Sequence, residues 1–419
     1  MKKFGYVLLC AGFLCGCILP GKIDRDTVLG ETSLITESAL PFEDEIQESS
    51  KVEKELKDEE EAEYVSAKTE SFTDEVKAAL MRKQQNLYYF SNLEITQQNL
   101  YVEILYALEN YIDEMEVSIK DTNQIDQVFQ CVLLDHPEIF YTDGYSFVKY
   151  TLGDEIKKIT FKGTYVYDQE EKKIKEKEIE EAALKLLTGI SADATDYEKV
   201  KYVYETIVNQ TEYNLEAEDN QNICSVFLNR SSVCQGYAKA VQYLLTKLNI
   251  PSTLVIGTVE NGEGHAWNLV KINNQYYYLD ATWGDASYLF HLNDKKQELQ
   301  NLPAINYDYL CVTTEEILRT HSLGDIAPMP LCDSLEANYY VREGAYFTEV
   351  NYDQLAQLLE RYKEEKRENV TLRCADDAVY QQMTEELLTK QKIFKYLEGS
   401  NHSIMYTDSP KQRSITFWL

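Results

Sequence analysis

The stretch HAWNLVKINNQYYYLDATWGD, residues 265–285, constrains the fold of this chain most strongly, because it predicts an antiparallel pair of strands. Two alternating, β-prone runs flank Asn273 and Asn274, a dipeptide suited to a two-residue hairpin turn. With that turn, Ile272 lies opposite Gln275, and the rest of the pairing follows from this register.

The predicted register places four side chains that could take part in catalysis on one face of the hairpin. Trp267 lies opposite Asp280, and His265 lies opposite Thr282. His265 and Asp280 then become diagonal neighbours, roughly 7 Å apart at the backbone, within reach of an imidazole–carboxylate hydrogen bond. A shift of the register by one residue would put them on opposite faces, so the inference depends on the turn.

A cysteine precedes this hairpin at the predicted start of a helix. In SSVCQGYAKA, residues 231–240, Cys234 stands where a polar turn gives way to apolar residues at helical spacing, and a proline follows the helix (Val241, Leu244, Leu245, Leu248; Pro251). Backbone N–H groups and the positive end of the helix dipole then face the sulfur and favour a reactive thiolate. Gly236 leaves room for a substrate backbone. The simpler alternative for Cys234 is a structural cysteine that happens to lie at a helix start.

These residues satisfy the requirements of nucleophilic catalysis. Cys234 would attack a carbonyl, His265 would exchange protons, and Asp280 would hold the imidazole in its productive tautomer. The backbone N–H of Cys234 is a natural donor to the oxyanion. We consider six residues as a second donor or a substrate contact: Tyr213, Asn222, Gln235, Gly236, Trp267 and Trp283.

The charge and the histidine pattern exclude other classes of function. The net charge is −30, from 71 acidic and 41 basic residues, and such a surface repels a phosphate backbone, so we expect no nucleic-acid partner. The five histidines are scattered and give no zinc-protease pair, and no EF-hand pattern occurs. We therefore expect neither a metal nor another cofactor.

The first residues, MKKFGYVLLCAGFLCGC, predict export. Two lysines and a short apolar run form a signal peptide over residues 1–16. The following Cys17 resembles the lipidated cysteine at the lipobox of bacterial lipoproteins, which implies a membrane anchor on the outer cell surface. A plain cleaved signal and a secreted protein are the alternative. Residues 17–71 are rich in charged and small polar residues and predict an acidic, disordered tether.

Three folded units are expected after the tether. Residues 72–168 predict a small α+β domain, with a helix over 99–115, a second helix that ends at Pro137, and strands over 145–152 and 159–168. We find no chemical motif in this unit.

The remaining two units are the one that carries Cys234, residues 169–325, and a C-terminal α+β domain, residues 326–419. The central unit includes a predicted helix within 196–214. The C-terminal unit has no evident catalytic cluster and predicts alternating strands and helices in the order strand, helix, strand, helix, strand (338–347, 353–365, 369–375, 377–391, 413–419).

Three blocks in the central unit resemble the signature blocks of the transglutaminase-like superfamily: VCQGYAKAVQYLL, GHAWNLVKI and YYYLDATWGD. They occur in the family's order, and the likeness spans about residues 190–325. The resemblance implies a papain-like α+β core, in which the cysteine helix packs on an antiparallel sheet, and a triad of Cys234, His265 and Asp280. Two small α+β domains would flank this core.

The family includes cross-linking enzymes, cysteine proteases, amidases and proteins that only bind, so the fold does not decide the reaction. Animal cross-linkers use a tryptophan ahead of the cysteine, whereas the first tryptophan here is Trp267. Trp267 and Trp283 either shield the histidine and aspartate from water or serve as core residues. We expect a surface-anchored cysteine enzyme acting on protein or peptide amide bonds; the alternative is a non-catalytic binding or scaffolding protein at the cell surface.

Overall fold

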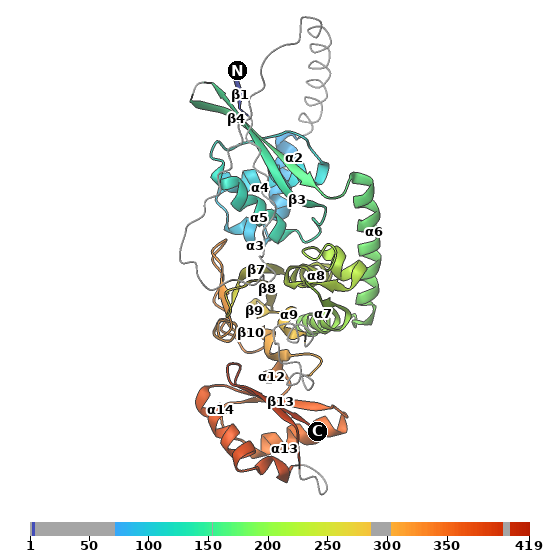
Figure 1. Ribbon diagram of the computed structural model, residues 1–419, viewed down its shortest axis with the longest axis vertical. Coiled ribbons are helices and arrows are strands. Elements are labelled where there is room, and N and C mark those ends of the chain that lie inside the picture. Colours follow the sequence, from blue (N-terminus) through green and yellow to red (C-terminus); the bar gives the residue numbers. More distant parts are fainter. Residues whose placement is uncertain (1, 5–71, 153, 286–302, 397–402) are drawn as a thin grey trace, which may run out of the picture.

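The computed structural model describes residues 2–4, 72–152, 154–285, 303–396 and 403–419. It is elongated, and three larger sheets follow one another along its long axis (Figure 1). Within these ranges, no helix has the length and apolar character needed to cross a bilayer. The predicted lipid attachment at Cys17, the tether over 17–71 and most of the signal peptide lie outside the described residues.

The N-terminal part combines a helical layer with an antiparallel sheet of order β1-β3-β4-β2. The two predicted helices and the predicted strand pair are confirmed, with small shifts of their ends. Its helices are α2 (Asp74–Gln84), α3 (Tyr88–Asn92), α4 (Ile95–Asn110) and α5 (Asn123–Asp135), and its strands are β1 (Lys2–Phe4), β2 (Met115–Val117), β3 (Thr142–Leu152) and β4 (Glu155–Tyr165).

Helix α6 (Gln169–Leu186) leads from the N-terminal part to the central part (Figure 1). It begins with a capping box, in which Asp168 and Glu171 satisfy each other's backbone N–H groups. The predicted helix within 196–214 is confirmed as α7. The elements between α6 and the sheet are a 3-10 turn (Leu187–Gly189), α7 (Asp196–Gln210), the paired β5 (Glu212–Tyr213) and β6 (Ser231–Ser232), a π-helical turn (Ser225–Asn229) and α8 (Cys234–Lys247).

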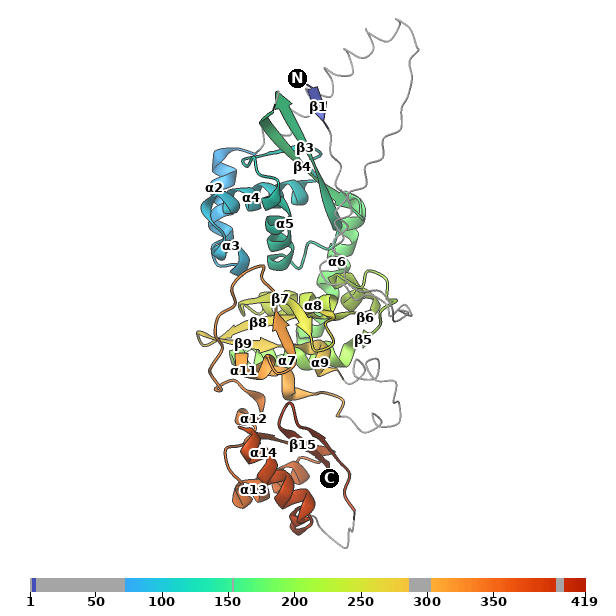
Figure 2. The ribbon, with the colours of Figure 1, turned by 60° about the vertical axis from the view of Figure 1, so that its left-hand side comes forward.

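The central sheet has five antiparallel strands in the order β10-β9-β8-β7-β11, and α8 packs on β7 and β8 (Figure 2). This arrangement confirms the predicted α+β class and the packing of the cysteine helix on an antiparallel sheet. The strands are β7 (Ser252–Val259), β8 (Gly264–Ile272), β9 (Gln275–Leu279), β10 (Leu310–Val312) and β11 (His321–Leu323), with short helices α9 (Ala281–Gly284), η3 (Tyr307–Tyr309) and α11 (Thr314–Ile317) between them.

The hairpin register predicted from Asn273 and Asn274 is confirmed as far as β9 extends. Both asparagines have positive φ, at 50° and 66°, as a tight primed turn requires, and Ile272 pairs with Gln275. Pairing ends at Asn268 opposite Leu279. The expected continuation of the ribbon beyond Leu279 is therefore wrong, because the chain turns there into α9.

The C-terminal part is a second α+β layer pair with sheet order β12-β13-β15-β14, in which β12 alone runs parallel to its neighbour. The strand predicted over 338–347 is wrong for its first half, where asparagine capping starts a short helix. The elements are α12 (Tyr339–Arg342), β12 (Tyr346–Phe347), α13 (Tyr352–Glu364), β13 (Asn369–Cys374), α14 (Asp377–Thr384), η4 (Glu385–Thr389), η5 (Lys392–Lys395), β14 (Tyr406–Ser409) and β15 (Ser414–Trp418).

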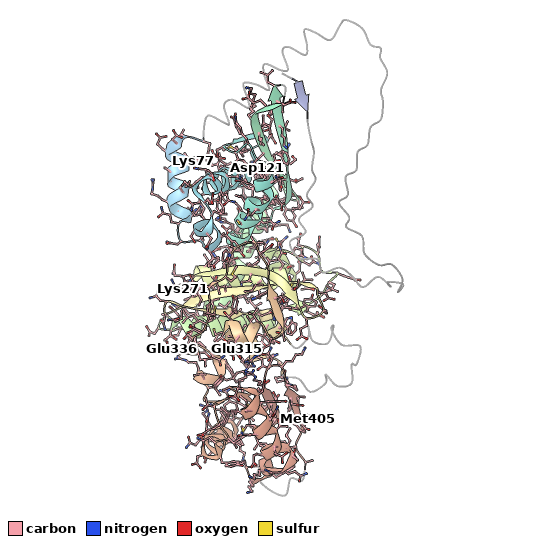
Figure 3. All side chains as sticks on the ribbon, turned by 90° about the vertical axis from the view of Figure 1, so that its left-hand side faces the viewer. Lys77, Asp121, Lys271, Glu315, Glu336 and Met405 are labelled. Carbon is pink, nitrogen blue, oxygen red and sulfur yellow. The ribbon has the colours of Figure 1, made fainter. Side chains whose placement is uncertain are left out.

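One continuous cluster of buried apolar residues runs through all three parts, from Tyr89 to Phe417. Glu315 lies at the junction between the central and the C-terminal part (Figure 3). There the guanidinium of Arg373, fully buried on β13, lies 3.0 Å from the Asp308 carboxylate and 3.1 Å from that of Glu316. Apart from β1, which lies in the predicted signal peptide, the strands of the three larger sheets fall within the three predicted units, whose boundaries remain predictions.

Candidate active site

Helix α8 begins at Cys234, as the sequence predicts. Val233 is the extended N-cap residue, and the N–H of Tyr237 donates to the Val233 carbonyl at 3.1 Å. The sulfur therefore lies at the first turn, where backbone N–H groups have no partner within the helix. Only 1% of the Cys234 surface is exposed.

Gly236 has a packing role that the sequence did not indicate. A Cβ atom at this position would lie 2.0 Å from the Ser232 hydroxyl and 2.9 Å from the Asn220 carbonyl oxygen. The absent side chain therefore lets α8 approach the preceding loop, and the space is already filled by the protein. Packing thus explains the glycine, and a contact of Gly236 with substrate stays a prediction.

His265 connects Cys234 with Asp280. Its Nε2 atom lies 2.7 Å from Oδ2 of Asp280, and its ring also hydrogen-bonds with the Cys234 side chain. Because Nε2 faces the carboxylate, Nδ1 is the ring nitrogen that remains for the sulfur. The three residues that the sequence predicted as a triad thus form one connected path, with His265 2% exposed and Asp280 fully buried.

Asp280 reaches His265 from a helix start rather than from a strand. It is the N-cap of α9, and its Oδ1 accepts the N–H groups of Thr282 at 2.9 Å and of Trp283 at 3.1 Å. Its own N–H donates to the Tyr309 carbonyl at 3.0 Å. The prediction that Thr282 shares the hairpin face is wrong, because that residue belongs to α9.

The charges of this pair stabilise each other. Burial lowers the pKa of His265, but the Asp280 charge, its hydrogen bond and the contact with Cys234 outweigh burial and raise that pKa to about 10. Burial raises the pKa of Asp280, and the two imidazoles of His265 and His321 overcome it and hold the pKa well below its usual range. The geometry thus favours an imidazolium beside a carboxylate.

His321, at the start of β11, is the site residue that the sequence analysis missed. Its Nε2 atom lies 3.0 Å from the same Oδ2 of Asp280, and its ring is 3% exposed. It stands 41 residues after Asp280 on a strand of three residues, too short for a periodic signal. The span of family resemblance, about residues 190–325, includes His321 but offers no motif for it.

Aromatic rings surround both imidazoles. Trp267 on β8 stacks on His265 with ring centroids 5.9 Å apart, and Trp283 in α9 meets His265 edge-on at 6.3 Å. Both tryptophans also lie about 5 Å from the His321 ring, at 4.9 and 5.0 Å. They are core residues that at the same time separate the histidine–aspartate cluster from water.

For the other predicted oxyanion donors and substrate contacts, the structure gives the position and the surroundings. Gln235 is buried, next to Cys234 in the first turn of α8. Tyr213 lies in β5 with its ring 6.4 Å from that of Tyr237. The Asn222 amide donates to the Phe140 carbonyl at 3.4 Å and accepts the Cys224 N–H at 2.8 Å, so it is engaged away from the sulfur. A second oxyanion donor remains a prediction.

His265, Asp280 and His321 are the one group within the described ranges whose ligand atoms lie close enough to hold a metal ion, all within 4.8 Å of one another. Both Nε2 atoms, however, already hydrogen-bond to the same carboxylate oxygen. A metal bound by all three would have to replace both hydrogen bonds. We therefore treat the group as a hydrogen-bonded cluster and assign no metal to it.

A cavity of about 580 Å³ lies at the junction with the C-terminal part, and neither Cys234 nor His265, Asp280 or His321 is among its lining residues. Trp283, which contacts the His265 ring, forms part of its wall. The other lining residues include aromatic, hydroxyl and amide side chains, such as Tyr309, Thr320 and Gln412, and also charged and aliphatic ones (Glu260, Asp308, Asp408, Lys411; Pro303, Ile305, Pro410). The cavity thus gives access to one side of the aromatic shell around the imidazoles.

Comparison with known proteins gives one family match. A sequence model of the transglutaminase-like superfamily matches residues 185–281, which include all three predicted triad residues. This match confirms the resemblance seen in the three sequence blocks. No curated protein matches the chain significantly.

Solved structures overlap only loosely with this one. A TGase is 17% identical over 42% of this chain and 52% of its own, with a TM-score of 0.25. The periplasmic domain of TgpA from Pseudomonas aeruginosa is 14% identical over 35% and 59%, with a TM-score of 0.22. Menin, in a structure that reveals its binding site for the Mixed Lineage Leukemia protein, is 16% identical over 48% and 43%, with a TM-score of 0.23. The chain thus spans about half the length of the TGase, and similarities this low support no inference about activity.

Proposed function

Since the chain contains a transglutaminase-like domain, we propose that it is a cysteine enzyme acting on amide bonds of proteins or peptides through a thioester. The observation that carries this proposal is the connected path from the Cys234 sulfur through the His265 ring to the Asp280 carboxylate. A nucleophile, a base and a group that orients the base are the parts that such chemistry needs.

The reaction would proceed in two steps. The Cys234 thiolate attacks the amide carbonyl, and the His265 imidazolium gives its proton to the departing amine as the carbon–nitrogen bond breaks. Water or a second amine then attacks the thioester, passes its proton to His265 and releases the thiolate. The Cys234 N–H, at the start of α8, would donate to the oxyanion in both steps.

The proposal extends to the location and the partners of the enzyme. The leader and Cys17 support a lipid anchor on the outer face of the membrane, where the substrate would be an extracellular or envelope protein or peptide. The cavity beside Trp283 is a candidate place for part of that substrate.

A peptide library incubated with and without a labelled primary amine tests the reaction, with mass spectrometry to detect cleavage, deamidation and amine incorporation. We expect one of these products from the native protein and none from Cys234→Ala. Cys224→Ala is the matched control, because Cys224 is also buried nearby in sequence but has no imidazole partner in the proposed mechanism. Equal turnover by Cys234→Ala would refute the role of the sulfur.

The burial of the site favours a second candidate, a non-catalytic binding or scaffolding protein that keeps this fold. Cys234 and His265 expose 1% and 2% of their surfaces, whereas an attacking sulfur must meet a substrate carbonyl. A library screen that yields no product, together with iodoacetamide labelling of Cys234 no faster than of the other buried cysteines, would favour this alternative.

A further inference from the structure

Asp280 is shared by two imidazoles, and its carboxylate is completely occupied. Oδ1 accepts two backbone N–H groups from α9, and Oδ2 accepts from Nε2 of His265 at 2.7 Å and from Nε2 of His321 at 3.0 Å. A triad needs only one of these imidazoles. The second one must be explained separately.

We infer that His321 is a positioning residue, which holds the Asp280 carboxylate in line with His265 and is itself oriented by a chain of hydroxyl and amide groups that begins in the C-terminal part. This inference rests on the function proposed above, because positioning matters only if His265 exchanges protons. It adds to the predicted triad one residue that acts through Asp280.

The backbone brings His321 to Asp280 through a close approach of strands. Strand β11 pairs with β7, with His321 opposite Val259 and Leu323 opposite Gly257. A Cβ atom at Gly257 would lie 2.0 Å from the Ser322 carbonyl oxygen and 2.6 Å from the Trp267 ring. Glycine at this position therefore allows β11 to lie beside the aromatic shell.

Hydrogen bonds define the tautomer of His321. A carboxylate only accepts, so Nε2 of His321 carries the hydrogen, and Nδ1 accepts from the Thr320 hydroxyl at 2.8 Å. The Thr320 hydroxyl in turn lies 3.5 Å from the Tyr309 hydroxyl, which accepts from the Gln412 amide at 3.0 Å. Every donor in this chain can point toward Asp280.

Gln412 links the chain to the buried ion cluster of the C-terminal part. Its Oε1 accepts from the Arg373 guanidinium at 3.3 Å, and this leaves its amide nitrogen directed at Tyr309. Arg373 is in turn held by Asp308 and Glu316. The turn between β14 and β15, which carries Gln412, thus contributes to the order of the active site.

The surroundings keep His321 neutral while His265 is charged. Burial lowers the pKa of His321, the Asp280 charge opposes that effect, and the neighbouring His265 cation lowers the pKa further. The Ile317 carbonyl also faces the ring and would favour a second hydrogen at Nδ1. A neutral donor can orient Asp280 without neutralising the charge that His265 needs.

Three variants test this inference: His321→Leu, His321→Gln and Thr320→Val. The glutamine amide can still donate to Asp280, whereas leucine cannot. For His321→Leu we expect a drop of kcat on the order of 10- to 100-fold with KM within about twofold, because a displaced general base slows the chemistry more than binding. His321→Gln should restore most of the rate. His136→Gln, at a buried histidine in the N-terminal part, is the matched control and should leave kcat unchanged.

Two readouts need no substrate and so separate this inference from the proposed function. Iodoacetamide labelling of Cys234 should slow in His321→Leu. ¹⁵N NMR of the imidazoles in Thr320→Val should show that His321 takes up a second hydrogen, at Nδ1 and directed at Ile317, at a higher pH than in the native protein, because Nδ1 has lost the hydroxyl that donates to it. If the native protein labels at Cys234 but turns over nothing, the proposed function fails and the labelling series still decides the positioning. Unchanged kcat and labelling in His321→Leu, or equal losses in the leucine and glutamine variants, would overturn the inference.

Discussion

Two buried carboxylates, Asp135 in the N-terminal part and Asp280 in the central part, each lie at the start of a helix, but their pKa values shift in opposite directions. Asp135 accepts the N–H groups of Tyr89 at 3.1 Å and Phe90 at 2.9 Å, at the start of α3. Asp280 likewise accepts two N–H groups, at the start of α9. Both carboxylates therefore cap a helix.

The third partner distinguishes them. Asp135 accepts the Tyr101 hydroxyl at 3.1 Å, and burial raises its pKa to about 6 despite the hydrogen bonds and the nearby His136. For Asp280, burial is outweighed by His265 and His321, so its pKa falls below the usual range. Capping a helix thus does not stop burial from raising the pKa of a carboxylate, whereas two imidazoles hydrogen-bonded to the carboxylate lower its pKa.

The largest difference should appear when each carboxylate is replaced by its amide. Asp280→Asn should lower kcat by about 10³- to 10⁴-fold, because the amide no longer selects the productive tautomer of His265. Asp135→Asn should leave kcat within about twofold, since Asp135 caps α3 away from the sulfur. Steady-state kinetics on any substrate found by the peptide screen measure both; equal losses would show that the comparison is mistaken.

A third type of buried carboxylate, paired with a permanent cation, gives the next largest effect. Arg373→Met should destabilise the protein by about 3–5 kcal/mol, because Asp308 and Glu316 then stay buried without their guanidinium. Urea unfolding followed by circular dichroism measures this loss. Adding Asp308→Asn and Glu316→Gln to that variant should recover part of it, and no recovery would argue against a charge effect.

The pH dependence of stability should differ in sign between the two carboxylates, by at most about 3 kcal/mol for Asp135. Because its folded-state pKa is raised from 3.8 to about 6, its contribution is complete below pH 3.8 and is lost as the pH rises to about 6. The contribution of Asp280 is present above pH 3.8 and is lost as the pH falls through its lowered folded-state pKa.

Urea unfolding of both Asn variants between pH 3 and 7 tests these signs. Asp135→Asn should remove the decline of stability between pH 4 and 6, and Asp280→Asn should remove part of the loss in stronger acid. Native-like slopes in both variants would mean that other groups cause the dependence.

The smallest expected effect on stability comes from the Tyr101 hydroxyl, the neutral group that donates to Asp135. Tyr101→Phe removes only the hydroxyl from Asp135 and should cost about 1 kcal/mol of the free energy of unfolding. It should leave the labelling of Cys234 unchanged. Slower labelling in this variant would reveal a coupling between the two regions that their hydrogen bonds do not explain.

The sequence predicts those parts of the site that depend on local signals. Helical spacing locates the start of α8 at Cys234, and the Asn273-Asn274 turn sets the register of β8 and β9. The predicted contact of His265 with Asp280 is present, but Asp280 makes it as a helix cap beyond the last paired residue and not through the strand register. Local patterns of this kind depend on a few consecutive residues, so one sequence suffices to read them.

The rest of the site depends on contacts that no local pattern specifies. His321 comes to Asp280 because β11 adds to the far edge of the sheet, beyond β7. Gln412 reaches Tyr309 from another sheet altogether, 103 residues later in the chain. Gly236 shows the same limit, since its need for space arises from Ser232 across a turn.

The apolar cluster that joins all three parts has a consequence for how the molecule melts. Because this cluster runs through all three parts, and a buried ion cluster adds to it at the junction with the C-terminal part, the three sheets should lose their order together on heating. A calorimetric trace would then show a single peak. The central part expressed alone would expose apolar surface on the two sides that contact the other parts.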